Sequence, residues 1–395
     1  MNMSVDKEVP QTNLPEFGAQ GGDRPQRPLT KKEEIELRFM KFMLGKTPDD
    51  VEALWLYAKT QHTPYPQNWP AYNAAQAEEK LLFLDILAEL CSSIKDNRQH
   101  VGKGGRPWKP LNEMAFACVC KVYEGLSSRR VSSDLEISKN RGYLSFVPSF
   151  NTVLNYLRSE EMTPILYALI ELSSMPLRGF EEVFAVDASG LSSAFYSRWL
   201  DYRFNGETRY RDWLKIHVAV GTKTQIVTAI RVTDGHTNDA PQFPALLKKT
   251  AEHFQVRAIC ADKGYSSRQN VQFAWDLGIL PLIPFKNNTT GNAGGSQAWR
   301  KMFIAYQADP ERFMKLYHQR SIVEASFSAL KRKFQGKLMH KSESGRVNEA
   351  LAKVLCYNIC VLIHEAKKNG IDLTFKTAAQ QPDAVHNNST EKKPE

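Results

Sequence analysis

Hydrophobic positions follow two different patterns in this chain, and the pattern changes near residue 180. Before that point apolar residues recur every three or four positions, which is typical of α-helices that bury one face. Helices are expected at 31–43, 49–59, 74–95, 111–123, 127–137 and 150–158. Beyond it, short apolar runs, one of which alternates at period two, predict β-strands. Strands are expected at 183–187, 214–220, 226–232, 256–261 and 280–285, with helices at 239–254, after Ser266, and at 310–334 and 348–367.

Three early strands followed by alternating helices and strands predict an α/β fold. We expect a mixed sheet flanked by helices and preceded by an all-helical N-terminal region. The polar ends of the chain have little apolar surface to bury, so we expect them to be disordered. The expected segments are 1–30 (disordered arm), 31–100 (helical N-terminal region), 101–110 (basic, glycine-rich linker), 111–175 (helical DNA-binding region), 180–367 (α/β domain) and 368–395 (flexible tail).

The composition of the chain indicates what kind of partner it binds. A chain of 395 residues, of which 42% are hydrophobic and 24% charged, is that of a soluble globular protein of two or three domains. The net charge of +9 favours a polyanionic partner. The positive charge is concentrated, because residues 300–346 contain eleven Lys and Arg against four Asp and Glu.

Cysteine usage and hydropathy indicate the compartment. The six cysteines form no CxxC pair with accompanying histidines, so we expect reduced core cysteines and no structural zinc site. No apolar stretch reaches the roughly 18–20 residues of a membrane span. Residues 1–27 lack the apolar core of a signal peptide. A cytoplasmic protein without membrane contact is expected.

The segment 111–158 has the order of a helix-turn-helix DNA reader. A glycine break at Gly125 follows its first helix, Ser127 is expected to cap the second, and Ser149 to cap the third. The third helix carries a polar side made of Asn151, Thr152, Asn155 and Arg158. About ten residues separate the last two helices, which is longer than the usual tight turn. A DNA reader and a plain helical packing domain therefore both stand as interpretations.

The linker at 101–110 carries Arg106 in a Gly-Arg-Pro step. An arginine in such a segment fits a narrow minor groove, where the negative potential attracts it. A plain flexible linker is the alternative interpretation.

Two predicted strands end in acids, Asp187 and Asp262. Sites in open α/β sheets form at the carboxyl ends of strands, so these two side chains are expected to converge. Three carboxylates at one point repel one another unless a cation lies among them. Oxygen ligands alone favour a hard cation such as Mg²⁺ or Mn²⁺. A metal site of this kind would need a third acid close to Asp187 and Asp262.

That acid is Glu324, in the pattern Tyr317-x2-Arg320-x3-Glu324-x6-Lys331. Steps of three, four and seven place all four side chains on one stripe of a helix. A carboxylate flanked by two cations suits a metal-bound phosphodiester. Each acid also has a simpler explanation: Asp187 as a turn residue, Asp262 as a helix cap, and Glu324 with Lys331 as a solvated helix face. The conjunction of the three favours the site.

In combination these motifs resemble the DDE transposases of bacterial insertion sequences, in the superfamily of insertion-sequence families four and five. The resemblance covers about Leu111 to His364 and rests on three motifs. They are Phe184-Ala185-Val186-Asp187-Ala188-Ser189-Gly190, Cys260-Ala261-Asp262-Lys263-Gly264-Tyr265 and the Tyr-Arg-Glu-Lys stripe. A looser match is Gly235-His236-Thr237-Asn238-Asp239-Ala240. The 62 residues between Asp262 and Glu324 leave no room for the large β-rich insert of some relatives.

The resemblance implies a ribonuclease H-like catalytic domain at 180–367, with Asp187, Asp262 and Glu324 as catalytic, metal-binding residues. It implies two Mg²⁺ ions, for which Mn²⁺ can substitute. Tyr317, Arg320 and Lys331 would contact DNA near the transposon end. From their chemistry and position we add Lys263, Arg106 and Arg158 as DNA-binding candidates. Asp239 is expected to cap its own helix, and His236 to be structural.

Three functions compete. The leading one is a transposase that binds the terminal inverted repeats of its element and catalyses Mg²⁺-dependent cleavage and strand transfer. Such a protein is expected to act on double-stranded DNA as a homodimer or larger assembly and to be associated with the nucleoid. The second is a catalytically silent or domesticated DNA-binding protein of transposon descent. The third is a metal-dependent hydrolase of small phosphate esters, which the basic stripe and the helix-turn-helix candidate disfavour, since neither serves a small substrate.

Overall fold

The computed structural model describes residues 34, 37, 65–96, 98, 108–193, 213–371 and 373, and the structural statements below concern these residues. Several expectations lie outside them: the arm at 1–30, the helices at 31–43 and 49–59, Arg106 with most of its linker, and nearly all of the tail.

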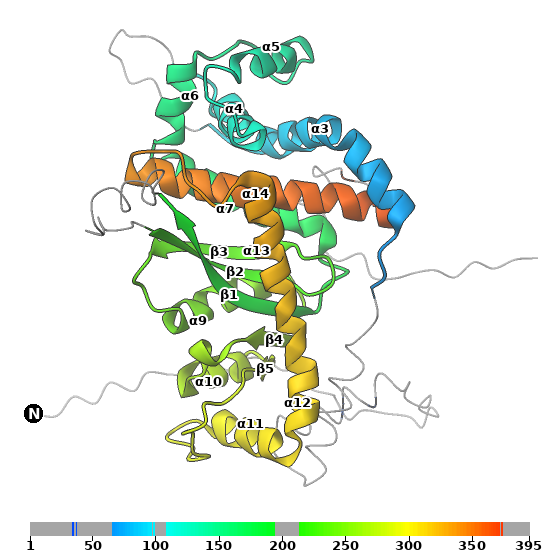
Figure 1. Ribbon diagram of the computed structural model, residues 1–395, viewed down its shortest axis with the longest axis vertical. Coiled ribbons are helices and arrows are strands. Elements are labelled where there is room, and N and C mark those ends of the chain that lie inside the picture. Colours follow the sequence, from blue (N-terminus) through cyan, green and yellow to red (C-terminus); the bar gives the residue numbers. More distant parts are fainter. Residues whose placement is uncertain are drawn as a thin grey trace, which may run out of the picture.

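A five-stranded mixed sheet forms the centre of the molecule (Figure 1). The strands are β1 (Val183–Ser192), β2 (Trp213–Gly221), β3 (Val227–Asp234), β4 (Ala258–Ala261) and β5 (Leu280–Leu282). Their order is β3-β2-β1-β4-β5, with β1 antiparallel to β2 and parallel to β4. All five strands were predicted.

Helices surround this sheet and form a separate layer before it. They are α3 (Trp69–Ser92), α4 (Leu111–Glu124), α5 (Ser132–Asn140), α6 (Phe150–Leu157), α7 (Met162–Ser174), α9 (Phe243–Ala251), α10 (Arg268–Asp276), α11 (Gln297–Ala308), α12 (Pro310–Tyr317), α13 (Ser321–Phe334) and α14 (Glu343–Asn369). Short 3₁₀ turns are η1 (Met175–Leu177), η2 (Ala240–Gln242), η3 (Lys263–Tyr265) and η4 (His318–Arg320). The result confirms the expected mixed sheet flanked by helices, with a helical region ahead of it.

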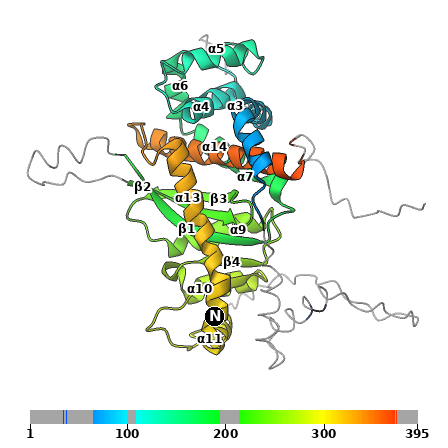
Figure 2. The ribbon, with the colours of Figure 1, turned by 45° about the vertical axis from the view of Figure 1, so that its right-hand side comes forward.

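The views in Figures 1 and 2 place α3 to α6 on one side of α14 and the sheet on the other. α14 packs against α3, α4 and α7 and also against β2 and β3, so it joins the helical region to the sheet. By length and composition α14 is apolar enough to cross a membrane, which the sequence interpretation did not anticipate. However, 83% of its apolar window is buried inside the fold. Its hydrophobicity is therefore that of a core helix covered on several sides.

Buried amides fix the register of α14 against its neighbours. Asn348, which is fully buried, donates hydrogen bonds to the carbonyl oxygens of Leu157 and Ser159, both 2.8 Å away. Asn358 is equally buried, accepts from the backbone N–H of Val227 (3.0 Å) and donates to its carbonyl (2.8 Å). Since a buried amide without partners is costly, these bonds hold α6 and β3 in place on α14.

Several boundaries differ from the sequence expectations. The second helix begins at Ser132 instead of Ser127, because the Ser127 carbonyl accepts from Arg130 and Val131 and forms a turn first. Ser267, not Ser266, caps α10. Helices α7 and α11 were missed, although Ala298, Trp299, Met302 and Ala305 of α11 are buried at helical spacing. The expected helix at 310–334 is divided by η4 into α12 and α13.

The turn between β2 and β3 is held by a buried carboxyl group. Glu181 has no exposed surface and accepts hydrogen bonds from the backbone N–H of Lys223 (3.0 Å) and Thr224 (2.5 Å). A Cβ on Gly221 would lie 2.3 Å from the Glu181 carboxyl carbon, so only glycine fits there. Burial raises the pKa of Glu181 to about 7, and the Thr224 bonds and the Lys223 charge oppose this without cancelling it.

This pKa predicts a pH dependence of stability. The folded state retains a proton that the unfolded state releases above pH 4.5, so rising pH destabilises the fold until pH 7. We expect the free energy of unfolding to fall by about 3 kcal/mol across this window relative to Glu181→Gln, at about 1.36 kcal/mol per pKa unit. Denaturant titrations of both proteins at several pH values measure the difference. Parallel curves for the two proteins would contradict the assignment.

Candidate active site

Three acids from three separate elements approach one another at β1. The sheet register pairs Val186 with Ala261, so the residues that follow, Asp187 and Asp262, lie side by side. Asp187 is not at a strand end as expected, because β2 continues to pair with β1 as far as Ser192. It lies in the middle of β1, at the level where the neighbouring β4 stops. The convergence is thus created by the end of β4, and Glu324 reaches it from α13, which packs on β1.

The pKa of Asp187 reflects the closeness of the other two acids. Burial is the largest cause that raises its pKa, and the negative charges of Asp262 and Glu324 raise it further. A hydrogen bond of 2.8 Å from the backbone N–H of Ala188 and the charge of Arg320 act in the opposite direction. A cation placed among the three acids would relieve the repulsion that this pKa reflects.

Arg320 supplies such a cation in the structure. Its Nη1 donates to Oδ2 of Asp187 at 2.8 Å and its Nη2 to Oε1 of Glu324 at 2.5 Å. Its Nε is buried without a hydrogen-bond partner, and its guanidinium carbon lies 5.7 Å from the ring centre of Tyr317. One guanidinium therefore bridges two of the three acids and has an unused donor.

Lys331 reaches β1 one step further along. Its Nζ donates to Oγ of Ser189 at 2.6 Å, and burial lowers the pKa of the ammonium group. Ser189 and Asp187 are two residues apart on β1, so their side chains lie on the same face of the sheet. Sequence reasoning missed Ser189 as a contact of the stripe, although its position two residues after Asp187 on a strand was a usable signal.

The four residues of the stripe still contact β1 or one another although η4 interrupts the helix. Arg320 and Lys331 both contact β1 residues, while Tyr317, half-buried at the end of α12, lies under the guanidinium of Arg320. The side chain of Glu324 is exposed, with 58% of its surface accessible to solvent. It is therefore free to turn toward Asp262 without repacking the core.

The remaining DNA-binding candidates are placed as follows. Lys263 is exposed on η3, directly after Asp262, and borders the site. Arg158 ends α6 in the helical region, where it donates to Asn155, and the structure does not bring it to the three acids. His236 lies in an exposed turn, where its backbone N–H donates to Oδ1 of Asp234 at 2.8 Å.

The opposite face of the sheet carries a polar cluster that sequence reasoning did not identify. His217 is fully buried, and burial lowers its pKa to about 4, so the ring is neutral. Its Nε2 pairs with Oγ1 of Thr233 (2.9 Å), and its Nδ1 lies 3.6 Å from Oδ1 of Asp239. Lys215 donates to the same Asp239 oxygen at 2.9 Å. Asp239 therefore does not cap its helix as expected: its side chain makes no capping bond and is paired with β2 instead.

The three acids are the candidate ligands for a metal ion. Within the described ranges, no three or more His, Cys, Asp and Glu side chains are gathered closely enough to hold an ion. Arg320 lies between two of the three acids, so Asp187 and Glu324 face a cation already. The donor set consists of carboxylates alone, which fits a hard cation such as Mg²⁺. The donor chemistry therefore fits Mg²⁺, but the three carboxylates are not gathered into an ion site while Arg320 pairs with Asp187 and Glu324.

Two comparisons with known proteins relate this chain to transposases. Residues 178–359 match the family model described as a transposase DDE domain. Over 211 residues the chain is 26% identical to an Archaeoglobus fulgidus protein described as a probable transposase for insertion sequence element ISA1214. That similarity covers 53% of this chain and 63% of the archaeal protein. The chain thus spans somewhat less than two thirds of this relative, and the matched family segment contains all three acids.

Proposed function

The chain carries a transposase DDE domain of the insertion-sequence kind, with a ribonuclease H-like sheet, and on this premise we propose that the protein mobilises its own element. It binds the terminal inverted repeats, cleaves the DNA strands at the element's ends and joins them to target DNA. The observation that carries this proposal is the neighbouring placement of Asp187 and Asp262, with Arg320 bridging Asp187 to Glu324 and Lys331 contacting β1 beside them.

Asp187, Asp262 and Glu324 would hold the divalent ions, two Mg²⁺ or Mn²⁺, through their carboxylate oxygens. When bound, two such ions activate an attacking oxygen and stabilise the departing one in phosphodiester chemistry. Glu324 would contribute by turning its exposed side chain toward the two aspartates. Burial is the largest cause of the raised pKa of Asp187, and positive charge shared by the three acids would offset the added repulsion from Asp262 and Glu324.

Arg320 and Lys331 hold the DNA. With its two carboxylates occupied by metal, Arg320 would have its planar fork free to grip a phosphate bidentately. Lys331 offers a point charge from its place beside Ser189, and Tyr317 stacks on a base or donates to a phosphate. Lys263 extends the same cationic border past Asp262. Four side chains thus position the strand against the acids without forming a covalent bond to it.

The helical region is proposed to recognise the element's ends. The side chains of Asn151, Asn155 and Arg158 are exposed on α6, which suits base and phosphate contacts. Arg106 would reach a minor groove from the segment before α4. Since two ends must be held together for transposition, a homodimer or larger assembly on nucleoid DNA is the working unit.

The direct test uses duplexes that carry the element's own inverted repeats. We expect nicking at the repeat end in Mg²⁺, full loss of nicking in EDTA with DNA binding retained, and recovery on addition of Mg²⁺ or Mn²⁺. Denaturing gels measure cleavage and fluorescence anisotropy measures binding. Cleavage that continues in EDTA would refute the metal requirement. Binding without cleavage in every metal would favour the silent DNA-binding protein.

A further inference from the structure

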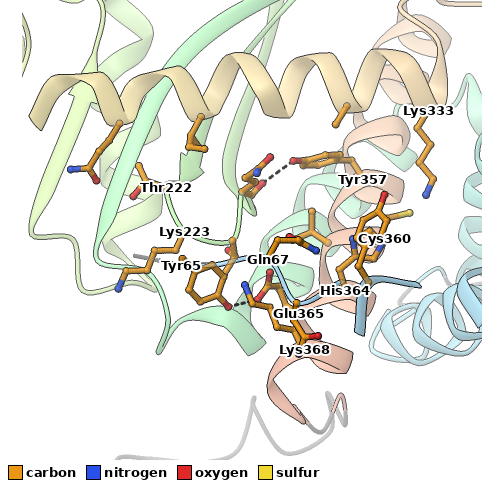
Figure 3. A pocket seen from close by; sticks show the side chains of 18 of the residues that line it. Tyr65, Gln67, Thr222, Lys223, Lys333, Tyr357, Cys360, His364, Glu365 and Lys368 are labelled. Atoms are coloured by element: carbon orange, nitrogen blue, oxygen red, sulfur yellow. Dashed lines mark hydrogen bonds between the residues drawn. The ribbon is translucent and has the colours of Figure 1, made fainter. Parts of the chain in front are cut away.

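A large hollow lies beside α13 (Figure 3). Its volume is about 950 Å³. At 100° per residue, Ile322, Ala329 and Lys333 of α13 point into it from the side opposite Glu324 and Lys331. The other walls are the chain at the start of α3, the β2–β3 turn at 222–225, and α14. The hollow is therefore separate from the candidate active site, although both use α13.

The charge of this hollow is strongly positive. Five cationic side chains line it against one carboxylate, Glu365. The cations are Lys223, Lys315, Arg332, Lys333 and Lys368, of which Figure 3 shows three at separate places around the hollow. Glu365 is buried and already accepts hydrogen bonds from Tyr65 and, at 2.9 Å, from Asn369. Burial lowers the pKa of His364, so this lining histidine is neutral and does not alter the balance.

Three of the five cations are available to a partner. Lys333 is paired with Glu79, and the Lys368 ammonium lies 3.3 Å from the ring centre of Tyr65. By contrast Lys223, Lys315 and Arg332 form no ion pair with any acid in the described part of the chain. They come from three different elements, the β2–β3 turn, α12 and α13.

The positions of these charges are fixed by the fold. The backbone of Lys223 is held by the buried Glu181 carboxyl group beneath the turn. Tyr357 anchors the same turn by donating to the carbonyl of Gln225 at 3.1 Å. Lys315 and Arg332 stand on helices. The backbone that carries these side chains is therefore ordered before a partner binds.

The lining identifies the partner as nucleic acid. Between the cations lie the amide side chains of Gln67, Gln76 and Gln319 and the ring of Tyr72, which donate to phosphates and sugars or contact a base. An apolar ligand would leave these groups and charges unpaired. A small phosphate would be held by cations that converge on it, whereas here Lys315 and Arg332 are exposed at the rim. Duplex DNA presents a row of phosphates, so it can pair with several separate cations at once.

We propose that this basic hollow is a second DNA-contacting site, which holds the sugar–phosphate backbone of a duplex segment other than the strand at the three acids. The proposal rests on the proposed function, because it assumes that the protein acts on DNA. It adds that α13 lies between two DNA segments, one on its carboxylate side and one on its Arg332 side. A transposition complex must bring an element end and a further duplex together, and this arrangement places both on one helix.

The test removes the three available charges in the full chain, as Lys223→Ala/Lys315→Ala/Arg332→Ala. For a random-sequence duplex we expect the slope of log K against log salt to fall by about 2 to 3, since each phosphate contact contributes about 0.9. Affinity at low salt should fall at least about tenfold. Fluorescence anisotropy from 50 to 200 mM salt, about the range over which such slopes are resolved, measures both.

Two controls separate charge from folding. The variant Lys223→Arg/Lys315→Arg/Arg332→Lys keeps the charges and should keep the wild-type slope. Lys95→Ala removes an exposed cation beyond the far end of α3, which ends about 24 Å from the nearest α3 lining residue, Gln76, at 1.5 Å per residue, and should leave the slope nearly unchanged. Cleavage of saturating repeat DNA by the triple alanine variant should persist, because the acids are untouched.

Each outcome decides the proposal. A triple alanine variant that binds duplex with the wild-type slope and affinity overturns it, while the cleavage assay still judges the proposed function on its own. Loss of inorganic phosphate or nucleotide binding by calorimetry, with duplex binding unchanged, also overturns it and assigns a small-anion site. A wild-type protein that binds no DNA would refute both proposals together. A reduced slope that only the charge-keeping variant restores supports the second site.

Discussion

Asp187→Asn, Asp262→Asn and Glu324→Gln are each expected to lower strand cleavage by roughly 10³-fold while DNA binding persists or strengthens. Each change removes a negative ligand at nearly constant shape. If metal stabilisation of the transition state is worth about 4 kcal/mol, its loss corresponds to roughly that factor. Binding should not weaken, because each acid repels phosphate and its removal lowers that repulsion. Gel assays of cleavage and anisotropy measurements of binding give the two readouts separately.

Glu311→Gln is the matched control for this series. Glu311 is an exposed glutamate in the first turn of α12, on the same arm of the chain as Glu324 but outside the stripe. We expect it to cleave at the wild-type rate. If Glu324→Gln cleaved as fast as Glu311→Gln, Glu324 would not be a metal ligand, and the triad would have to be abandoned. A fall in cleavage that is matched by a fall in DNA binding would indicate a folding defect instead.

The strands were predictable because their signals are local. Apolar runs bounded by turn residues located β1 to β5, and the alternation at 214–220 identified β2. The largest overestimate was the last strand, expected at 280–285 but ending at Leu282, and β4 begins at Ala258 instead of residue 256. Pro284 has no N–H to donate to a neighbouring strand, and β5 is the edge of the sheet, so the ladder stops although Ile283 and Phe285 remain buried.

The composition of the candidate site was predictable, but its internal contacts were not. Residue spacing alone placed Tyr317, Arg320, Glu324 and Lys331 on one stripe. The bridge from Arg320 to Asp187 depends on how α13 docks on β1, 133 positions earlier in the chain. Likewise the pairing of Asp239 with Lys215 depends on the ladder between β2 and its neighbours. Local patterns do not encode either distance.

The basic hollow illustrates the same limit. Its lining comes from α3, the β2–β3 turn, the α12–α13 arm and α14, which are distant from one another in sequence. In isolation each of its cations resembles an ordinary solvated surface residue. Only the excess of Lys and Arg at 300–346 was visible beforehand, and it did not distinguish the two sides of α13.

Arg320 is the residue for which metal binding and DNA binding should change in opposite directions. In the absence of DNA its guanidinium occupies Asp187 and Glu324 and competes with a metal ion for both carboxylates. We therefore expect Arg320→Ala to bind Mn²⁺ about tenfold more tightly than wild type, equivalent to about 1.4 kcal/mol. The same variant should bind repeat DNA more weakly and cleave it poorly, because the phosphate fork is lost.

Lys331→Ala separates these two effects, since Lys331 contacts Ser189 and no acid. The Lys331→Ala variant should bind DNA more weakly and keep the wild-type affinity for Mn²⁺. The Mn²⁺ affinity of Arg320→Lys should lie between those of wild type and Arg320→Ala, because one ammonium group cannot bridge both carboxylates as a guanidinium does. Calorimetry with Mn²⁺ on DNA-free protein measures this. If Arg320→Ala and wild type bound Mn²⁺ equally, Arg320 would not compete with metal, and its ion pairs would have to be explained as structural contacts between η4, β1 and α13.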